Sequence, residues 1–216
     1  MAFINHSKKI LFIHSPRTGG TSFEWALRKN LKDDFKLLPK HISFKGLQNS
    51  VQEDLTDYKK VSFVRNPWDM VMSWWQWYHE SREKLFGLSL EMFSSEEEFS
   101  QFITKSFNPN YSKGLFPHTS NKKNLDLLSY FDGANDFKFY KFEDYNNSFK
   151  NASKYLLDTP LLQNNYTKTH YRGASEWGNK IKGYKKYSYK EFFTTKHKEL
   201  VYKLAKNYID KFEYTF

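Results

Sequence analysis

Residues 14–27 have the sequence HSPRTGGTSFEWAL, which has the outline of a phosphate-binding loop. In such loops, glycines let the backbone approach an anion at the start of a helix. Nucleotide-hydrolysing loops of the form G-x-x-x-x-G-K-[ST] place a lysine before the final Ser or Thr, where it reaches the β- and γ-phosphates. Here that position is Thr21, and the only cation in the loop sequence is Arg17. The stretch therefore predicts an anion site that differs from an ATP site.

The flanking residues predict a strand before the loop and a helix after it. The segment KILFIHS at 9–15 is a short apolar run, as expected of a buried parallel strand. From Thr21 onward the pattern becomes helical, with Phe23, Ala26 and Leu27 on one face. The order strand, glycine turn, helix is the context that a phosphate loop requires.

Further strands and helices are predicted along the chain. Strands are predicted within FKLLPKHISF (35–44), KKVSFVRN (59–66) and FKFYKFED (137–144). Helices are predicted over 93–105, where Ser94 and Glu97 form a capping box, and over 194–212, with Leu200, Leu204, Tyr208 and Phe212 as the apolar stripe. This alternation favours an α/β domain around a mostly parallel sheet.

Composition limits the possible classes. A length of 216 residues suits one domain, and 27% charged with 19% aromatic residues is a globular composition. No apolar run approaches the ~20 residues of a membrane span, and the apolar part of the N-terminus is too short for a signal peptide. The absence of cysteine excludes thiolate metal sites and disulfides, and it fits a cytoplasmic protein.

The net charge is +10, from 34 basic and 24 acidic residues. This excess fits a lysine-rich surface without a specific role. It equally fits a polyanionic partner such as nucleic acid, an anionic nucleotide or an acidic glycan. Charge alone leaves these alternatives open.

A second anion site is predicted where the third strand ends, in VSFVRNPWDMVMSWW. Asn66 is a good N-cap, Pro67 suits the first helical position, and Asp69 lies in the first turn. The helix therefore begins beside Arg65 and carries the Ser73 hydroxyl on the same face as its cap. An arginine fork with a hydroxyl is a suitable phosphate receptor, although an ordinary surface arginine and a solvent-facing serine would give the same pattern.

Ligands of open α/β sheets bind outside the carboxyl ends of the strands. The glycine loop and Arg65 with Ser73 both follow predicted strands, so the two sites should be neighbours. Two neighbouring anion sites indicate a ligand with two separated anionic groups.

These motifs resemble those of the P-loop sulfotransferases, in particular the bacterial branch related to the Golgi glycan sulfotransferases. IHSPRTGGTSFEWAL resembles the family loop P-K-T-G-G-T-S, and FVRNPWDMVMSWW resembles the motif F-V-R-N-P-x-x-R-x-x-S. LPKHISF, YKFED and the closing YKLAKNYIDKFEYTF extend the likeness over most of the chain. It implies a three-layer P-loop fold with a mostly parallel central sheet flanked by helices. The length favours one domain over 1–216, in which residues 82–130 match no part of the family pattern and are interpreted as an insertion at the acceptor site.

The resemblance implies the cofactor and the residues that hold it. The loop would bind the phosphosulfate of 3′-phosphoadenosine 5′-phosphosulfate (PAPS) through Arg17, Thr18, Gly19, Gly20, Thr21 and Ser22. Arg65 and Ser73 would bind its 3′-phosphate, and adenosine 3′,5′-bisphosphate (PAP) would be the product. Apart from the resemblance, Lys168 and Arg172 lie in a basic stretch after the fourth predicted strand and are interpreted as closing over the cofactor. The chain departs from the family in having Arg17 in place of lysine and Met70 where an arginine is common.

Sulfuryl transfer answers the question raised by the missing lysine. The transferred group carries less charge than a phosphoryl group, so positioning and donors aimed at the bridging oxygen should suffice. Helix amides, the Thr21 and Ser22 hydroxyls and Arg17 can supply these donors, and Arg17 would also act in catalysis. No metal is expected.

The alcohol acceptor must lose a proton, and histidine is the usual base near neutral pH. His41 in LPKHISF follows a predicted strand, and the resemblance supports it as the base. His6, His79, His118 and His197 are interpreted as surface residues, His14 as a core residue, and His170 as a weak candidate. Glu24 and Asp69 are fallback bases whose helix pairing and capping already explain them. The aromatic residues Trp68, Trp74, Trp75, Trp77 and Tyr78 favour core packing over a ligand platform.

The sequence thus predicts an enzyme, a PAPS-dependent sulfotransferase with a hydroxyl acceptor, taken to be a carbohydrate. Neither a nucleic-acid partner nor a membrane span is expected. The alternatives are a P-loop nucleotide kinase, which needs a Walker lysine and a Mg²⁺-linked aspartate, and a non-catalytic binder of acidic glycan or nucleic acid.

Overall fold

The computed structural model describes residues 2–31, 35–39, 42–75, 96–107, 125–134, 136–161 and 189–216. The chain divides into two compact units, Met1–Arg65 with Leu128–His170 and Asn66–Leu127 with Tyr171–Phe216. The first unit carries a β-sheet, and the described residues of the second form helices. The expected single domain over 1–216 stays a prediction.

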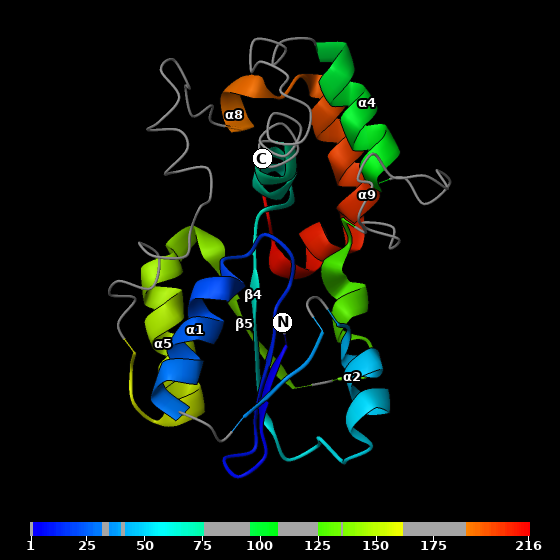
Figure 1. Cartoon of the computed structure of the whole chain (residues 1–216). Helices are drawn as coiled ribbons and strands as arrows, with labels where there is room; N and C mark the ends of the chain where they lie inside the picture. Colours follow the sequence, from blue (N-terminus) through cyan, green and yellow to red (C-terminus); the bar gives the residue numbers. More distant parts are fainter. Residues whose placement is uncertain are drawn as a thin grey trace, which may run out of the picture. The chain divides into compact units, whose positions relative to one another are not determined.

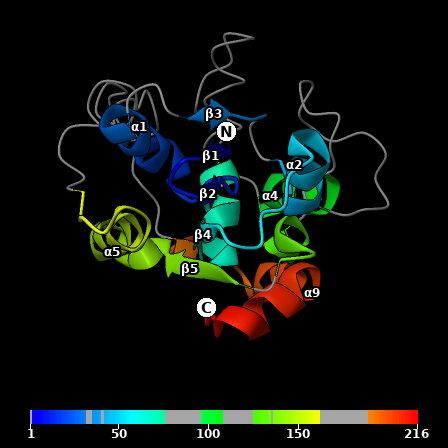
Figure 2. The ribbon, with the colours of Figure 1, turned by 90° about the horizontal axis from the view of Figure 1, so that it is seen from below.

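The first unit is built on a five-stranded mixed sheet (Figure 1). The strand order is β3-β1-β2-β4-β5, which can be followed in Figure 2. The strands are β1 (Phe3–Asn5), β2 (Ile10–Ile13), β3 (Lys36–Leu37), β4 (Lys59–Val64) and β5 (Phe137–Lys141). Strands β2, β4 and β5 are parallel, whereas β1 is antiparallel to both of its neighbours. The predicted α/β class with a mostly parallel sheet is therefore confirmed.

The alternation of side chains along the strands determines how the sheet is covered. Phe12 lies opposite Phe3 on one side and Val61 on the other, and all three face the same core cluster. Leu11 and Ile13 point to the opposite face and to a second cluster. Both faces are therefore apolar, and each needs a covering layer.

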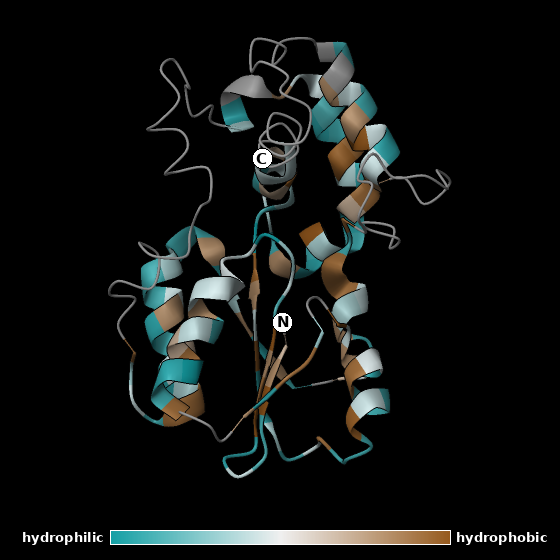
Figure 3. Cartoon of the chain, in the orientation of Figure 1, coloured by the Kyte–Doolittle hydropathy of each residue, from teal (hydrophilic) through white to brown (hydrophobic). Residues whose placement is uncertain are grey.

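Helices cover both faces of this sheet (Figure 2). Helices α1 (Gly20–Leu31) and α5 (Tyr145–Leu157) pack on one face through Phe23, Phe149 and their apolar neighbours. Helix α2 (Phe44–Val51) and the 3-10 turn η2 (Leu127–Phe131) pack on the other face through Leu47 and Phe131. Figure 3 shows the apolar strands between helices whose outer faces are hydrophilic.

The sequence did not predict β1 or its hairpin with β2. The hairpin turns over residues 6–9, where Lys9 has a positive φ of 49°. The Asn5 side-chain oxygen accepts a hydrogen bond from Lys8 N at 2.7 Å, which stabilises the turn. A strand of three residues is too short for periodicity to reveal it, and β3, predicted within 35–44, has only two residues.

The second unit begins with the helix at 67–75, which starts where the sequence predicts. Asn66 caps it, since its side-chain oxygen accepts a hydrogen bond from Trp68 N at 3.1 Å. Trp68 and Trp75 are buried, as the core interpretation of these aromatic residues predicts. Ser73 is also buried, so the alternative of a solvent-facing serine is wrong.

The remaining described helices of this unit are α4 (Glu96–Phe107), α8 (Tyr189–Phe192) and α9 (Thr195–Phe212). The predicted apolar stripe of α9 is only partly correct. The buried residues are His197, Val201, Ala205, Tyr208 and Ile209, whereas three of the four predicted positions lie at the edge of this face. A spacing of four residues drifts around a helix of 3.6 residues per turn, so spacing alone misplaced the face.

Among the described residues, no helix combines the length and apolarity that crossing a membrane requires.

Candidate functional site

The glycine loop lies between β2 and α1, at the carboxyl end of β2. Two of its residues have a left-handed backbone, Arg17 with a φ of 59° and Gly19 with a φ of 77°. Alternation of left-handed and ordinary residues turns successive amides toward one side, the geometry of an anion-binding nest. A positive φ at a non-glycine residue is unusual, so surrounding contacts must hold Arg17 in place.

Residues from the two neighbouring strand ends supply such contacts. Arg65, directly after β4, donates a hydrogen bond from Nη1 to the Arg17 carbonyl oxygen at 2.8 Å. Tyr145, at the start of α5 after β5, donates from its hydroxyl to the Gly19 carbonyl oxygen at 2.6 Å. The Arg65 guanidinium also lies 4.3 Å from the centre of the Phe142 ring. The structure therefore brings Arg17 and Arg65 together at the carboxyl ends of the parallel strands.

The two glycines of the loop allow close packing. A Cβ on Gly19 would lie 2.7 Å from the Tyr145 ring and 2.9 Å from the Phe142 ring. A Cβ on Gly20 would overlap the buried ring of His14. Larger residues at 19 or 20 would displace these rings, so the loop backbone lies directly against its supports. His14 is a core residue, as predicted.

The side chains of the loop differ in what they can offer a ligand. Thr18 is buried and donates to the Ser15 carbonyl oxygen at 2.8 Å, so its hydroxyl supports the loop. Ser22 is also buried, and its backbone N–H donates to the Gly19 carbonyl oxygen at 3.2 Å. Arg17 and Thr21 are partly exposed. Of the predicted loop side chains, these two are the accessible donors.

The electrostatic environment of the loop favours an anion. The first amides of an α-helix lack intrahelical acceptors, and they form the positive end of the helix dipole. The first turn of α1 contains no acidic residue. Glu24, in the next turn, is buried 3.9 Å from Arg28, so the predicted pairing is confirmed.

The predicted partnership of Arg65 with Ser73 stays a prediction. Arg65 ends the first segment of the first unit, and Ser73 belongs to the second unit. Met70, on the same helix as Ser73, is buried, so its side chain fills the core where the family pattern has an arginine.

Several predicted site residues lie outside the described residues. They include the proposed base His41 and the cofactor-closing residues Lys168 and Arg172. His79, His118 and His170 also lie outside. Their roles therefore remain predictions from the sequence.

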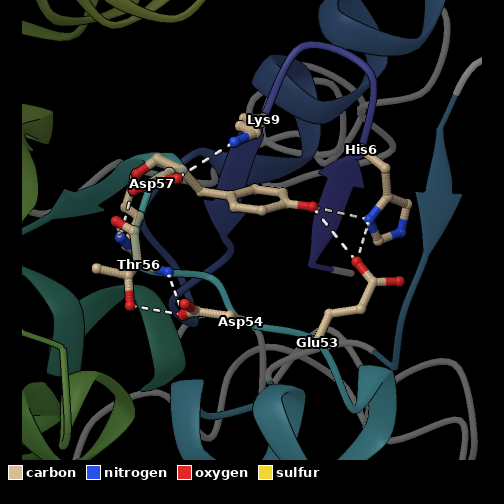
Figure 4. Close-up of polar contacts among 8 residues, drawn as sticks. His6, Lys9, Glu53, Asp54, Thr56 and Asp57 are labelled. Atoms are coloured by element: carbon tan, nitrogen blue, oxygen red, sulfur yellow. Dashed lines mark hydrogen bonds and ion pairs between the residues drawn. The ribbon is translucent and has the colours of Figure 1, made fainter.

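His6 lies at the other end of the sheet, in the turn that precedes β2. Its Nδ1 is 2.8 Å from a Glu53 carboxylate oxygen and 2.9 Å from the Tyr58 hydroxyl (Figure 4). Burial and the nearby Glu53 carboxylate raise the pKa of Tyr58 above its usual value. Because the glycine loop is at the carboxyl ends of the strands, this cluster cannot serve the same ligand. It ties the β1–β2 turn to the segment before β4.

His197 is buried, so its interpretation as a surface residue is wrong. The 2.6 Å distance between its Nε2 and the Ser100 hydroxyl suggests a nucleophile and base. Its Nδ1, however, lies 3.4 Å from the backbone N–H of Thr194, a donor. A neutral ring that accepts at Nδ1 carries its proton on Nε2, so it donates to Ser100 and cannot deprotonate it. The pair is structural and joins α4 to α9.

A cavity of about 250 Å³ adjoins this pair in the second unit. Its polar lining is largely engaged in helix-surface contacts, such as Gln101 Nε2 donating to Glu97 at 3.2 Å and Lys105 donating to Gln101 at 3.3 Å. Thr104 donates to a backbone carbonyl oxygen. The cavity therefore indicates no particular ligand.

Within the described ranges, no group of three or more His, Cys, Asp or Glu side chains is arranged to hold a metal ion. Sequence reasoning missed Phe142 and Tyr145, which contact the loop from the end of β5. Phe142 lies near the carboxyl end of the stretch 137–144 in which a strand was predicted, and Tyr145 directly follows that stretch. This position was a usable signal, because the carboxyl ends of parallel strands lie together.

No protein-family model matches this chain, and neither a curated protein nor a solved structure matches it. Function therefore has to be inferred from the chain's own residues.

Proposed function

We propose that the protein is a PAPS-dependent sulfotransferase. The observation that carries the proposal is the glycine loop at the start of α1, with two left-handed residues and with Arg65 held against it from the next strand end. This arrangement joins an amide-rich anion site to a second cation at one edge of the sheet. The motif resemblance selects PAPS among ligands with two separated anionic groups.

In this proposal the loop holds the 5′-phosphosulfate. The amides at the start of α1, the partly exposed hydroxyl of Thr21 and the guanidinium of Arg17 would stabilise charge on the bridging oxygen as the S–O bond breaks. Arg65 and Ser73 would hold the 3′-phosphate, and Lys168 and Arg172 would close over the cofactor. Neither a Walker lysine nor a metal ion is required, since sulfuryl transfer depends on positioning.

The acceptor in this proposal is a hydroxyl group, taken to be on a carbohydrate, and His41 is the general base. The hydroxyl oxygen attacks sulfur in line with the leaving phosphate, His41 takes the hydroxyl proton, and PAP leaves. The family's three-layer P-loop fold and the assignment of 82–130 to the acceptor site form part of the same proposal.

Ligand ranking tests the proposal. PAP should raise the melting temperature more than 5′-AMP or ATP with Mg²⁺ at equal concentration, because only PAP places an anion at both predicted sites. A ligand at ~100 times its dissociation constant adds ~2.7 kcal/mol of stability, which a thermal-shift assay resolves. If ATP with Mg²⁺ outranks PAP, the sulfotransferase proposal fails and a nucleotide kinase is favoured.

The Arg65→Ala variant refines this test. Hydrogen bonds to charged groups are worth ~1.5–3 kcal/mol. Losing the contact with the 3′-phosphate should therefore weaken the binding of PAP by about ten- to a hundredfold. Arg65 also contacts the Arg17 carbonyl oxygen, so 5′-AMP should weaken too, but less. The matched control is Lys59→Ala, since Lys59 is a cation at the opposite end of β4 and forms an exposed ion pair with Asp158. Equal losses for PAP and 5′-AMP would contradict a 3′-phosphate role.

A further inference from the structure

Tyr145 contacts the glycine loop in two ways. Its hydroxyl donates to the Gly19 carbonyl oxygen at 2.6 Å, and its ring occupies the space that a Gly19 side chain would need. The ring itself is fixed by aromatic neighbours, with Phe63 at 5.5 Å and Phe142 at 5.2 Å between ring centres. A hydroxyl on such a fixed ring can determine where the carbonyl points.

The direction of this carbonyl also determines the direction of an amide. In a trans peptide the C=O and the following N–H lie in one plane and point in opposite directions. Because Tyr145 holds the Gly19 carbonyl, the Gly20 N–H must point away from Tyr145. The same logic applies to Arg65, which holds the Arg17 carbonyl and so directs the Thr18 N–H away from itself.

Without the Tyr145 hydroxyl, the Gly19 carbonyl oxygen keeps only the longer hydrogen bond from Ser22 N, at 3.2 Å, to oppose a turn of this peptide. Glycine populates positive and negative φ about equally, so the loop has no intrinsic preference for the left-handed state found here. A rotated peptide would point a carbonyl oxygen, and not an amide, at the anion. The Tyr145 hydroxyl selects against this rotation.

We propose that Tyr145 is a positioning residue that orients the Gly20 amide toward the 5′ anionic group of the ligand. The proposal deepens the proposed function and rests on it for the identity of that ligand as PAPS. The anion site itself can be tested with inorganic pyrophosphate, which needs no assumption about the nucleoside.

The experiment uses the full chain and the Tyr145→Phe variant, which keeps the ring and removes only the hydroxyl. The matched control is Tyr140→Phe, because the Tyr140 hydroxyl also donates to a backbone carbonyl oxygen, that of Asn151, but away from the loop. Affinities for pyrophosphate, 5′-AMP, adenosine 3′-monophosphate and PAP are measured by calorimetry. The melting temperature without ligand reports folding.

Tyr145→Phe should weaken pyrophosphate, 5′-AMP and PAP by about 3- to 10-fold, the value of one neutral hydrogen bond. Adenosine 3′-monophosphate should be unaffected, a selectivity that general destabilisation would not produce. Tyr140→Phe should bind all four ligands like the unmutated chain.

Unchanged binding of pyrophosphate and 5′-AMP to Tyr145→Phe would overturn the positioning role and leave the proposed function intact. If the unmutated chain binds pyrophosphate but not PAP, the sulfotransferase proposal fails, and pyrophosphate still decides the role of Tyr145. If the unmutated chain binds neither, both proposals are overturned.

Discussion

Gly19 is subject to two separate constraints. Its backbone is left-handed, and the Tyr145 ring occupies the space that a side chain at this position would need. Gly133 has the first constraint without the second. Its φ is 86°, and an added Cβ would have only the Gln48 side-chain oxygen nearby, at 3.9 Å. The two positions therefore separate backbone strain from steric overlap.

Gly133→Ala should lower the free energy of unfolding by about 1 kcal/mol, the cost of a left-handed alanine. Gly19→Ala should lower the free energy of unfolding by about 1–3 kcal/mol more than Gly133→Ala does, because the Tyr145 and Phe142 rings must move. Urea denaturation of both variants measures the difference. Equal losses would show that the rings yield to the extra methyl group at no cost.

At the scale of single residues, the sequence predicted the glycine turn between a strand and a helix and Arg65 on the neighbouring strand end, but it did not predict the contact from Tyr145. The glycines and Arg17 are recognisable because their types and spacing are the signal. The partners Arg65 and Tyr145 come from distant parts of the chain, and only the sheet brings them to the loop. The burial of His197 was missed because it was interpreted as a surface residue from its polar side chain, although its position lies on the buried face of α9.

Among the elements, α9 has a well-defined start. The Thr194 side chain accepts a hydrogen bond from His197 N, while the His197 ring accepts one from Thr194 N, which makes a capping box with histidine in place of Glu or Gln. The same histidine bonds Ser100 on α4. The cap therefore also fixes how the two helices pack.

Thr194→Ala should lower the free energy of unfolding by about 1 kcal/mol, the usual value of an N-cap. Thr195→Ala is the control, because Thr195 is exposed at the first helical position and makes no cap. Chemical denaturation followed by circular dichroism compares the two. A loss in Thr195→Ala as large as that in Thr194→Ala would contradict the capping role.

Elements were predictable where a long apolar run or a cap signal marked them. The strands at 9–15, 59–66 and 137–144 and the helix that Asn66 caps are present as predicted. The β1–β2 hairpin was not predictable, because its pairing depends on a three-residue strand and on a turn residue, Lys9, in a conformation that its type does not favour.

Across the described residues of the first unit, three tyrosines have a pKa raised by burial, and in two of them a nearby ionisable group adds to the effect. They are Tyr58, Tyr130 and Tyr140. The folded state keeps these phenol protons at a pH where the unfolded chain, with a value of about 10, releases them. Their contribution to stability is therefore present below about pH 10 and is lost as pH rises through the folded-state values.

We expect the unfolding free energy to fall between about pH 9 and pH 11, and the fall to be smaller when the three tyrosines are replaced by phenylalanine. Denaturation at a series of pH values measures the change, and tyrosinate absorbance follows the titration. Tyr202→Phe is the control, because Tyr202 is 42% exposed. An identical pH profile in the triple variant would assign the loss to other groups.

The hydrogen bonds from Arg65 and Tyr145 to the loop backbone have a thermodynamic consequence for the whole first unit. Arg65 directly follows β4, and Tyr145 begins α5, the helix after the edge strand β5. The loop conformation and the position of these elements therefore share one set of contacts. Linkage is reciprocal. A ligand that binds this loop conformation must therefore stabilise the packing of the edge strand β5 by the same free energy that this packing adds to ligand binding. Loosening β5 would therefore weaken ligand binding, as a change in the loop itself would.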